Sequence, residues 1–247
     1  MDAEEYERMW NDAVEYNKAL LSKSNRYNMT DEQRKEYESV LDVTGTGIMG
    51  YIEIPSIDVS LPIYHGTNES VLQIAIGHIE SSSLPVGGIG THCVISGHRG
   101  LPSAKLFTDI DQLQNGDRFM IQVLDRTLTY EVDQIRIVLP SELQDLEIDP
   151  NQDYCTLVTC TPYGVNTHRL LVRGHRVENE KGQANVTAEA IQFEPVIMAP
   201  LIAAPLLLIL IIWLFIFTGK RAKHKDALRE QRERLLDEEE INEVKKH

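Results

Sequence analysis

The sequence predicts a mostly β domain that follows N-terminal helices and precedes a membrane-spanning helix. Between residues 45 and 178, many short runs of alternating or β-branched residues are separated by glycine, proline and polar turns. Residues 1–44 have charged and apolar residues at loosely helical spacing, and residues 196–218 form one continuous uncharged apolar run. Many short strands with few helices are typical of a closed β-barrel or a β-sandwich, and this pattern alone does not choose between them.

The N-terminal segment, residues 1–44, is expected to form two helices. The first covers about residues 2–21, and Thr30 is expected to cap the second, which runs to about residue 41. We interpret the two helices as a structural collar that packs on the β domain.

Several segments of the β domain, residues 45–178, can be assigned individually. Residues 71–79 fit both a helical turn and a strand, and residues 104–113 have the pattern of a short helix. Residues 118–124 and 127–139 are expected to pair as a hairpin. Further strands are expected at residues 51–54, 59–64, 92–97, 156–160 and 168–172.

Residues 195–218 are expected to cross the cell membrane once, because about 20 apolar residues span a bilayer. A polar linker, residues 179–194, precedes this helix. A charged tail, residues 219–247, follows it and begins with Lys220, Arg221, Lys223 and Lys225. The positive-inside rule therefore predicts a cytoplasmic C-terminus and an extracellular β domain. Because the chain begins with acidic residues and shows no export leader, we expect a leader to precede the given start.

Composition excludes several classes of protein. The net charge of −14, from 38 acidic and 24 basic residues, argues against nucleic acid as a partner, which requires a basic face. The three cysteines form no CxxC pair, so a zinc ribbon or a thioredoxin-type site is not supported. The glycines do not form a phosphate-binding loop, and the acidic residues lack calcium-loop spacing, so we predict neither a cofactor nor a metal.

Cys160 is the candidate nucleophile. It stands at the end of a predicted strand, and Pro162 and Gly164 mark the loop after it. A thiol nucleophile needs a lowered pKa, a proton-transfer partner and a donor for the oxyanion that it generates. Arg169, at the start of the return strand, offers positive charge and N–H donors. His98, after the strand at residues 92–97, is the candidate proton-transfer group.

Each of these assignments has a rival. Considered alone, Cys160 also fits a buried strand cysteine, His168 adjoins Arg169, and Arg173 shares a strand face with Arg169. Neighbouring strand residues point to opposite faces, so His168 and Arg169 are not expected to line one cleft. Thr159 is expected to line the site beside Cys160.

Two motifs together resemble the catalytic signature of the sortases, which are bacterial surface transpeptidases. They are TLVTC at residues 156–160, with Arg169 downstream, and ISGHRG at residues 95–100. The flanking segments resemble the pilus-assembling class C branch: GIMGYIEIP, LPIYHG, SLPVGG and GLPSAKLFTDID, at residues 47–55, 61–66, 83–88 and 100–111. The resemblance covers about residues 45–177. It implies a closed barrel of about eight strands and supports His98, Cys160 and Arg169 as the catalytic residues.

The resemblance also implies a reaction. Cys160 would cleave an LPxTG-like sorting signal on a surface or pilin protein through a thioacyl intermediate, and a lysine amine of another pilin subunit would resolve it. One alternative is a housekeeping sortase, whose acceptor is a peptidoglycan amine. Another is a non-catalytic, membrane-tethered binding domain. Some class C sortases have a lid with an Asp-Pro-aromatic tripeptide, and none precedes residue 45, so a lid of that type is not carried over.

Overall fold

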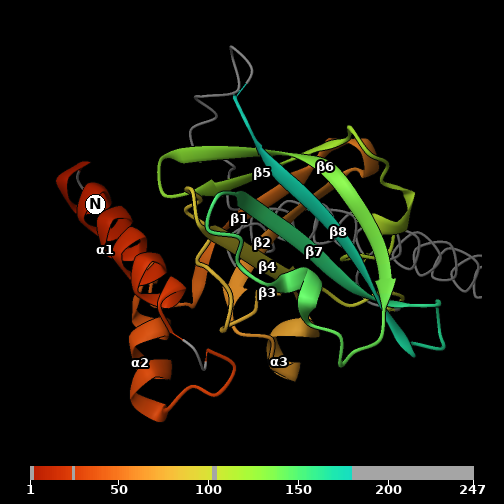
Figure 1. Cartoon of the computed structure of the whole chain (residues 1–247), viewed down its shortest axis with the longest axis horizontal. Helices are drawn as coiled ribbons and strands as arrows, with labels where there is room; N and C mark the ends of the chain where they lie inside the picture. The colour runs from red at the N-terminus through yellow and green to blue at the C-terminus, as the bar shows by residue number, and fades with distance from the viewer. Residues whose placement is uncertain (1–2, 24–25, 102–104, 180–247) are drawn as a thin grey trace, which may run out of the picture. The chain divides into compact units, whose positions relative to one another are not determined.

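The structure is a computed structural model that describes residues 3–23, 26–101 and 105–179. In this part of the chain, eight strands close into a barrel (Figure 1). This arrangement decides between the two architectures that the sequence pattern allowed, in favour of the barrel. The strands are β1 (Ile48–Ile54), β2 (Val59–His65), β3 (Ile76–His78), β4 (Thr91–Ser96), β5 (Arg118–Val123), β6 (Arg126–Val138), β7 (Asp153–Thr161) and β8 (His168–Val177).

The strand order around the barrel is β1-β2-β3-β4-β7-β8-β6-β5, with β5 closing on β1. Most neighbours are antiparallel, including the predicted hairpin of β5 and β6. Two pairs are parallel, β2 with β3 and β4 with β7. The second parallel pair matters most for function, because it joins the strand that leads to His98 to the strand that carries Cys160.

Strand alternation sorts the side chains of β4, β6, β7 and β8 into two apolar clusters. Inward-facing residues such as Cys155, Leu157 and Val172 belong to the main core. On the outer face, a second cluster packs together, with Ile79 and Leu146 over it; its members are Val94, Val138, Val158 and Leu171. The barrel therefore has a second, smaller buried core on the outer face of its wall, in addition to its apolar interior.

The predicted N-terminal helices are present as α1 (Ala3–Leu21) and α2 (Asp31–Ser39), and they pack against the barrel. Thr30 caps α2 as predicted, in a capping box with Gln33. Tyr37 of α2 is fully buried, and its hydroxyl lies 2.9 Å from Nδ1 of His78 and accepts the amide of Gly66 at 3.0 Å. These contacts give the helices a structural role of the kind that a collar requires.

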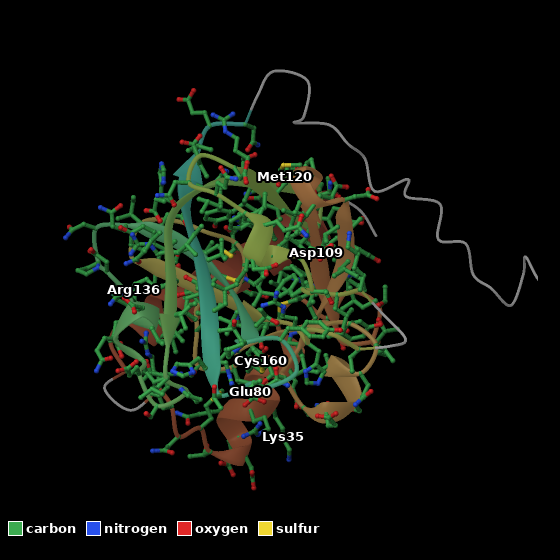
Figure 2. All side chains as sticks on the ribbon, turned by 90° about the vertical axis from the view of Figure 1, so that its right-hand side faces the viewer. Lys35, Glu80, Asp109, Met120, Arg136 and Cys160 are labelled. Carbon is green, nitrogen blue, oxygen red and sulfur yellow. The ribbon has the colours of Figure 1, made fainter. Side chains whose placement is uncertain are left out.

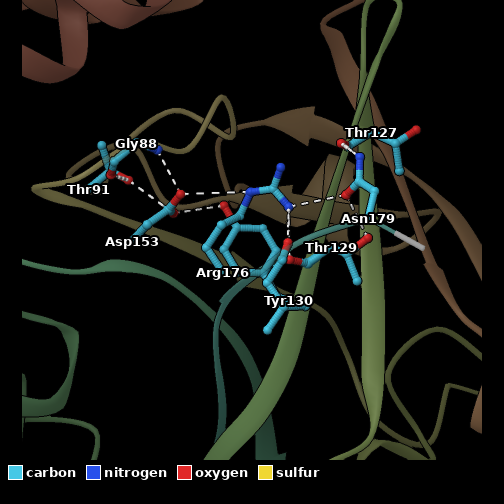
Figure 3. A network of polar contacts seen from close by, with 9 residues as sticks. Gly88, Thr91, Thr127, Thr129, Tyr130, Asp153, Arg176 and Asn179 are labelled. Atoms are coloured by element: carbon cyan, nitrogen blue, oxygen red, sulfur yellow. Dashed lines mark hydrogen bonds and ion pairs between the residues drawn. The ribbon is translucent and has the colours of Figure 1, made fainter. Parts of the chain in front are cut away.

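A polar network fixes the start of β7 (Figure 3). The Asp153 carboxylate accepts the Gly88 amide at 2.8 Å and the Tyr130 hydroxyl at 3.0 Å, and Nε of Arg176 lies 3.9 Å away. Burial raises the pKa of Asp153, while these donors oppose the shift. Asp153 and Thr91 form the first pair of the β4–β7 ladder, so the network fixes the ladder at its start.

Two local predictions are resolved differently. Residues 71–79 contain both alternatives, a short helix α3 (Glu69–Leu72) followed by β3. The helix expected at residues 104–113 is wrong. The described part of that stretch consists of turns and a 3-10 helix, Ile110–Gln112. Leu106 has a φ of 36°, outside the right-handed helical region, so an α-helix cannot run through it.

The membrane helix expected at residues 195–218 lies outside the described residues, as do most of the linker and the whole charged tail. Within the described residues, no helix combines the length and the apolar character needed to cross a membrane.

Candidate active site

The β7–β8 hairpin brings two of the three predicted residues together. Cys160 and Arg169 stand directly opposite each other in the antiparallel ladder. Such partners point to the same face, with Cβ atoms about 4.5–5.5 Å apart. Both side chains are partly exposed on the outer face of the barrel. The fold thus places Arg169 directly across the ladder from the thiol, within reach of its long side chain.

The parallel ladder between β4 and β7 brings in His98. Its last pair is Ser96 with Val158. Beyond that pair the two segments stay in contact, because the Gly97 amide donates to the Val158 carbonyl at 3.0 Å. The Thr159 hydroxyl then donates to the Gly97 carbonyl at 2.8 Å, across 62 positions of sequence. The register therefore sets His98 level with Cys160.

His98, Cys160 and Arg169 thus form one row across three adjacent segments of the barrel wall. Neighbouring strands lie about 4.8 Å apart, so the row places the positions of His98 and Arg169 on opposite sides of the position of Cys160. In Figure 2, Cys160 lies well away from Met120 of β5, toward the end of the barrel where Glu80 lies. The register brings the positions of the three predicted residues side by side, and their catalytic roles stay a prediction.

The two side chains that flank Cys160, those of Arg169 and His98, have different contacts. Nη1 of Arg169 donates to the carbonyl oxygens of Asn166 at 3.3 Å and His168 at 3.1 Å, which keeps the side chain along the β7–β8 loop. On the other side, Nε2 of His98 lies 3.8 Å from Oε1 of Glu69, the first residue of α3. Glu69 was not predicted as a site residue, because nothing in the local sequence connects it to His98.

Two glycines allow the segment around His98 to pack closely. A Cβ on Gly97 would lie 2.8 Å from side-chain atoms of Ile76 and Phe107. A Cβ on Gly100 would lie 2.8 Å from the ring of Tyr163, in the loop after Cys160. The guanidinium of Arg99 lies 5.7 Å from the centre of the same ring. The loop after His98 therefore packs directly on the loop after Cys160.

The structure separates each rival from the row. His168 pairs with Thr161 and precedes Arg169, so it lies on the opposite strand face. Arg173 is held by Asp133, at 2.9 and 3.1 Å, and stacks 4.1 Å from the ring centre of Tyr154.

The three cysteines are also in different environments. All three are free thiols, but Cys93 and Cys155 are buried, whereas Cys160 is partly exposed. Burial raises the pKa of the Cys155 thiol well above its usual range, which keeps that thiol protonated and unreactive.

The expectation for Thr159 needs correction. Its side chain is 1% exposed and faces inward, so it does not line the site. From the inner face of the barrel, its hydroxyl donates to the Gly97 carbonyl and thereby positions the segment that carries His98. The parity that places Cys160 outside already requires Thr159 to face inside, and this signal was available in the sequence.

No metal-binding arrangement is found in residues 3–23, 26–101 and 105–179, where no three His, Cys, Asp or Glu side chains group suitably for a metal ion. The row offers a thiol at Cys160, an imidazole at His98 and a guanidinium at Arg169. A thiol, a proton-transfer group and a cationic donor on one face are the components of nucleophilic acyl transfer.

A barrel with such a row defines a cysteine transpeptidase of the sortase type, and comparison with known proteins agrees. The sortase domain model matches residues 52–177, and the chain belongs to the sortase family, whose members are cysteine transpeptidases. Among curated proteins, the chain is similar to sortase D of Bacillus subtilis, with 30% identity over 153 residues, covering 61% of this chain and 73% of that protein.

Several solved class C sortases are more similar still. Sortase C1 from Streptococcus agalactiae is 56% identical, with a TM-score of 0.71, over 73% of this chain and 93% of that one. Sortase C of Streptococcus pneumoniae is 46% identical, with a TM-score of 0.66, over 72% and 91%. Sortase C-1 from Actinomyces oris is 44% identical, with a TM-score of 0.66, over 70% and 99%.

Proposed function

We propose that this sortase cleaves an LPxTG-like sorting signal and transfers the carboxyl end of the threonine to a lysine amine of a pilin subunit. The observation that carries the proposal is the row of His98, Cys160 and Arg169. Membership of the sortase family sets the class of reaction.

The roles follow from the positions in the row. The Cys160 thiolate attacks the threonine carbonyl carbon, and Arg169 stabilises the oxyanion of the tetrahedral intermediate. When the C–N bond breaks, His98 donates a proton to the departing glycine amine, leaving a thioester on Cys160. An acceptor amine then attacks the thioester, the C–S bond breaks, and a new amide forms.

Apolar packing beneath the row supports the proposed chemistry by holding its strands in place. Val158 and Leu171 stand two pairs below Cys160 and Arg169 in the same ladder and face the same way, but they are only 6% and 4% exposed because Ile79 and Leu146 pack against their cluster. This buried apolar contact anchors β7 and β8 directly below the nucleophile and the proposed oxyanion donor.

The choice of acceptor rests on the class C resemblance. The work on the pneumococcal enzyme concerns pilin substrate specificity, and a related Streptococcus agalactiae enzyme belongs to a pilus island. We extend this to the present chain as a proposal. A peptidoglycan amine is the alternative acceptor, and products of stepwise increasing mass with a purified pilin would distinguish the two.

We also propose that residues 195–218 anchor the enzyme in the cell membrane, with the barrel outside and the tail in the cytoplasm. The apolar run and the positive residues after it support this orientation. In intact cells, external protease should degrade the barrel and spare an epitope placed at the C-terminus. Degradation of the epitope at the same rate would contradict this topology.

Incubation with an LPxTG peptide tests the proposed reaction. Mass spectrometry should detect a thioester on Cys160 in the wild-type protein and none in Cys160→Ala. Cys155→Ala is the matched control, because that thiol is buried, and it should still form the thioester. A non-catalytic binding domain would form no adduct, and an adduct on another cysteine would contradict the assignment of Cys160.

A further inference from the structure

The row gives the reaction a direction in space. His98 and Arg169 lie on opposite sides of Cys160, toward β4 and toward β8 respectively. The oxyanion lies toward the guanidinium, so the leaving amine must lie toward the imidazole that protonates it. The acceptor amine attacks the same carbon from the position that the leaving amine vacated. It therefore reaches the thioester on the His98 side.

The His98 side is bounded by the start of α3, where Glu69 lies. Its Oε1 is 3.8 Å from Nε2 of His98. The helix is fixed there, because the Asn68 side chain accepts the Val71 amide at 3.1 Å and Gln73 donates to Glu69 at 2.5 Å. The Glu69 side chain nevertheless remains 72% exposed, so a ligand can reach it.

Other carboxylates in this region are already neutralised by arginines. Asp111 pairs with Arg99, the residue next to His98, and Glu80 is held by Arg34 at 2.5 and 2.6 Å. Glu69 pairs with His98 instead, a group whose charge changes during the reaction. A negative charge beside the imidazole is thus available to a cation that arrives on this side.

We propose that Glu69 selects the acceptor by binding the protonated lysine side chain next to His98. This inference rests on the proposed function and names the group that recognises the amine. At Glu69 the ammonium loses one proton to water. As the neutral amine forms the new C–N bond, its second proton passes to His98. The C–S bond then breaks and releases the Cys160 thiolate beside an imidazolium.

Glu69→Gln tests this role, because it removes the charge and keeps the size and the acceptor oxygen for Gln73. The donor is a fluorescent LPxTG peptide. The acceptors are a lysine peptide, which is cationic, and hydroxylamine, which is uncharged at neutral pH. Glu38→Gln, on the exposed face of α2, is the matched control for loss of one negative charge.

An exposed ion pair contributes up to about 1 kcal/mol, so Glu69→Gln should raise the KM for the lysine peptide about fivefold at low salt. The difference should shrink at high salt, because salt screens exposed charges. The KM for hydroxylamine should stay unchanged, because this uncharged acceptor offers no cation for Glu69 to bind. Glu69→Asp should recover part of the lysine affinity, and Glu38→Gln should behave like wild type.

Two outcomes would overturn the proposal. If Glu69→Gln slows thioester formation and affects both acceptors equally, Glu69 orients His98 or holds α3 and does not select the amine. If the variant is indistinguishable from wild type with the lysine peptide, the contact has no role in acceptor binding. Failure of the wild-type protein to form any thioester would instead refute the proposed function, so the two failures can be told apart.

Discussion

Replacement of Arg169 by alanine should abolish most of the transfer activity while leaving the fold intact. A guanidinium about 4 Å from an oxyanion contributes about 4 kcal/mol at an effective dielectric constant of about 20. This value agrees with the loss of about 2.7–4 kcal/mol, or about 10²- to 10³-fold in kcat, for one oxyanion donor. Because Arg169 donates to the carbonyls of Asn166 and His168, both close to it in the chain, its removal should cost little stability.

Arg173 supplies the matched control, because it has the same charge, the same strand and the same face. It lies four positions along β8, which is about 13 Å at the usual rise per residue. At that distance the same calculation gives about 1.3 kcal/mol, and salt screening reduces it to about 0.3 kcal/mol, less than twofold in rate. Arg173→Ala should instead lose about 1 kcal/mol of stability, because it breaks the contact with Asp133.

The assay compares initial rates of LPxTG peptide cleavage at equal concentrations of folded protein, with urea unfolding to measure stability. We expect opposite patterns: Arg169→Ala should be almost inactive and stable, and Arg173→Ala should be active and less stable. Equal losses of kcat in the two variants would refute the argument from position along the strand.

Three further predictions concern the support of the site. Gly97→Ala should lose both activity and about 1–3 kcal/mol of stability, because the new Cβ crowds the segment that carries His98. Gly50→Ala should lose stability alone, because its Cβ would lie 2.5 Å from a backbone oxygen far from the row. Thr159→Val should cost about 1–3 kcal/mol in urea unfolding by leaving the Gly97 carbonyl unpaired, and Thr159→Ser should not. Burial lowers the pKa of His92 from 6.5 to about 4, so the unfolded chain binds the proton first as pH falls. Stability should therefore fall by about 3 kcal/mol between pH 6.5 and pH 4, and the urea midpoint of His92→Gln should change less over this range.

Local sequence patterns predicted most of the strands, because alternation is a local property. The hairpin of β5 and β6 and the cap at Thr30 match the expectations closely. The helix predicted at residues 104–113 was wrong because Phe107, Ile110 and Leu113 have helical spacing in the sequence but are buried in the core from separate turns. Core packing decided the backbone there, and a local pattern does not contain that information.

The three site residues were accessible from the sequence only through a resemblance and a parity argument. The parity of β7 and β8 could place Cys160 and Arg169 on one face. The position of His98 could not be derived, because it depends on a parallel pairing between strands far apart in sequence. Glu69 was not predicted for the same reason, because α3 lies next to His98 only once the barrel has closed.

The parallel pairing of β4 with β7 also has a consequence for folding kinetics. Its partners are 62 positions apart, with the β5–β6 hairpin between them, and such distant contacts form slowly. Before that ladder exists, the chain carries three ordinary thiols. Afterwards, Cys93 and Cys155 are enclosed and Cys160 alone remains accessible. The number of cysteines that a short pulse of reagent alkylates during refolding will therefore fall from three to one. The time of this fall reports both the closure of the β4–β7 ladder and the assembly of the active site.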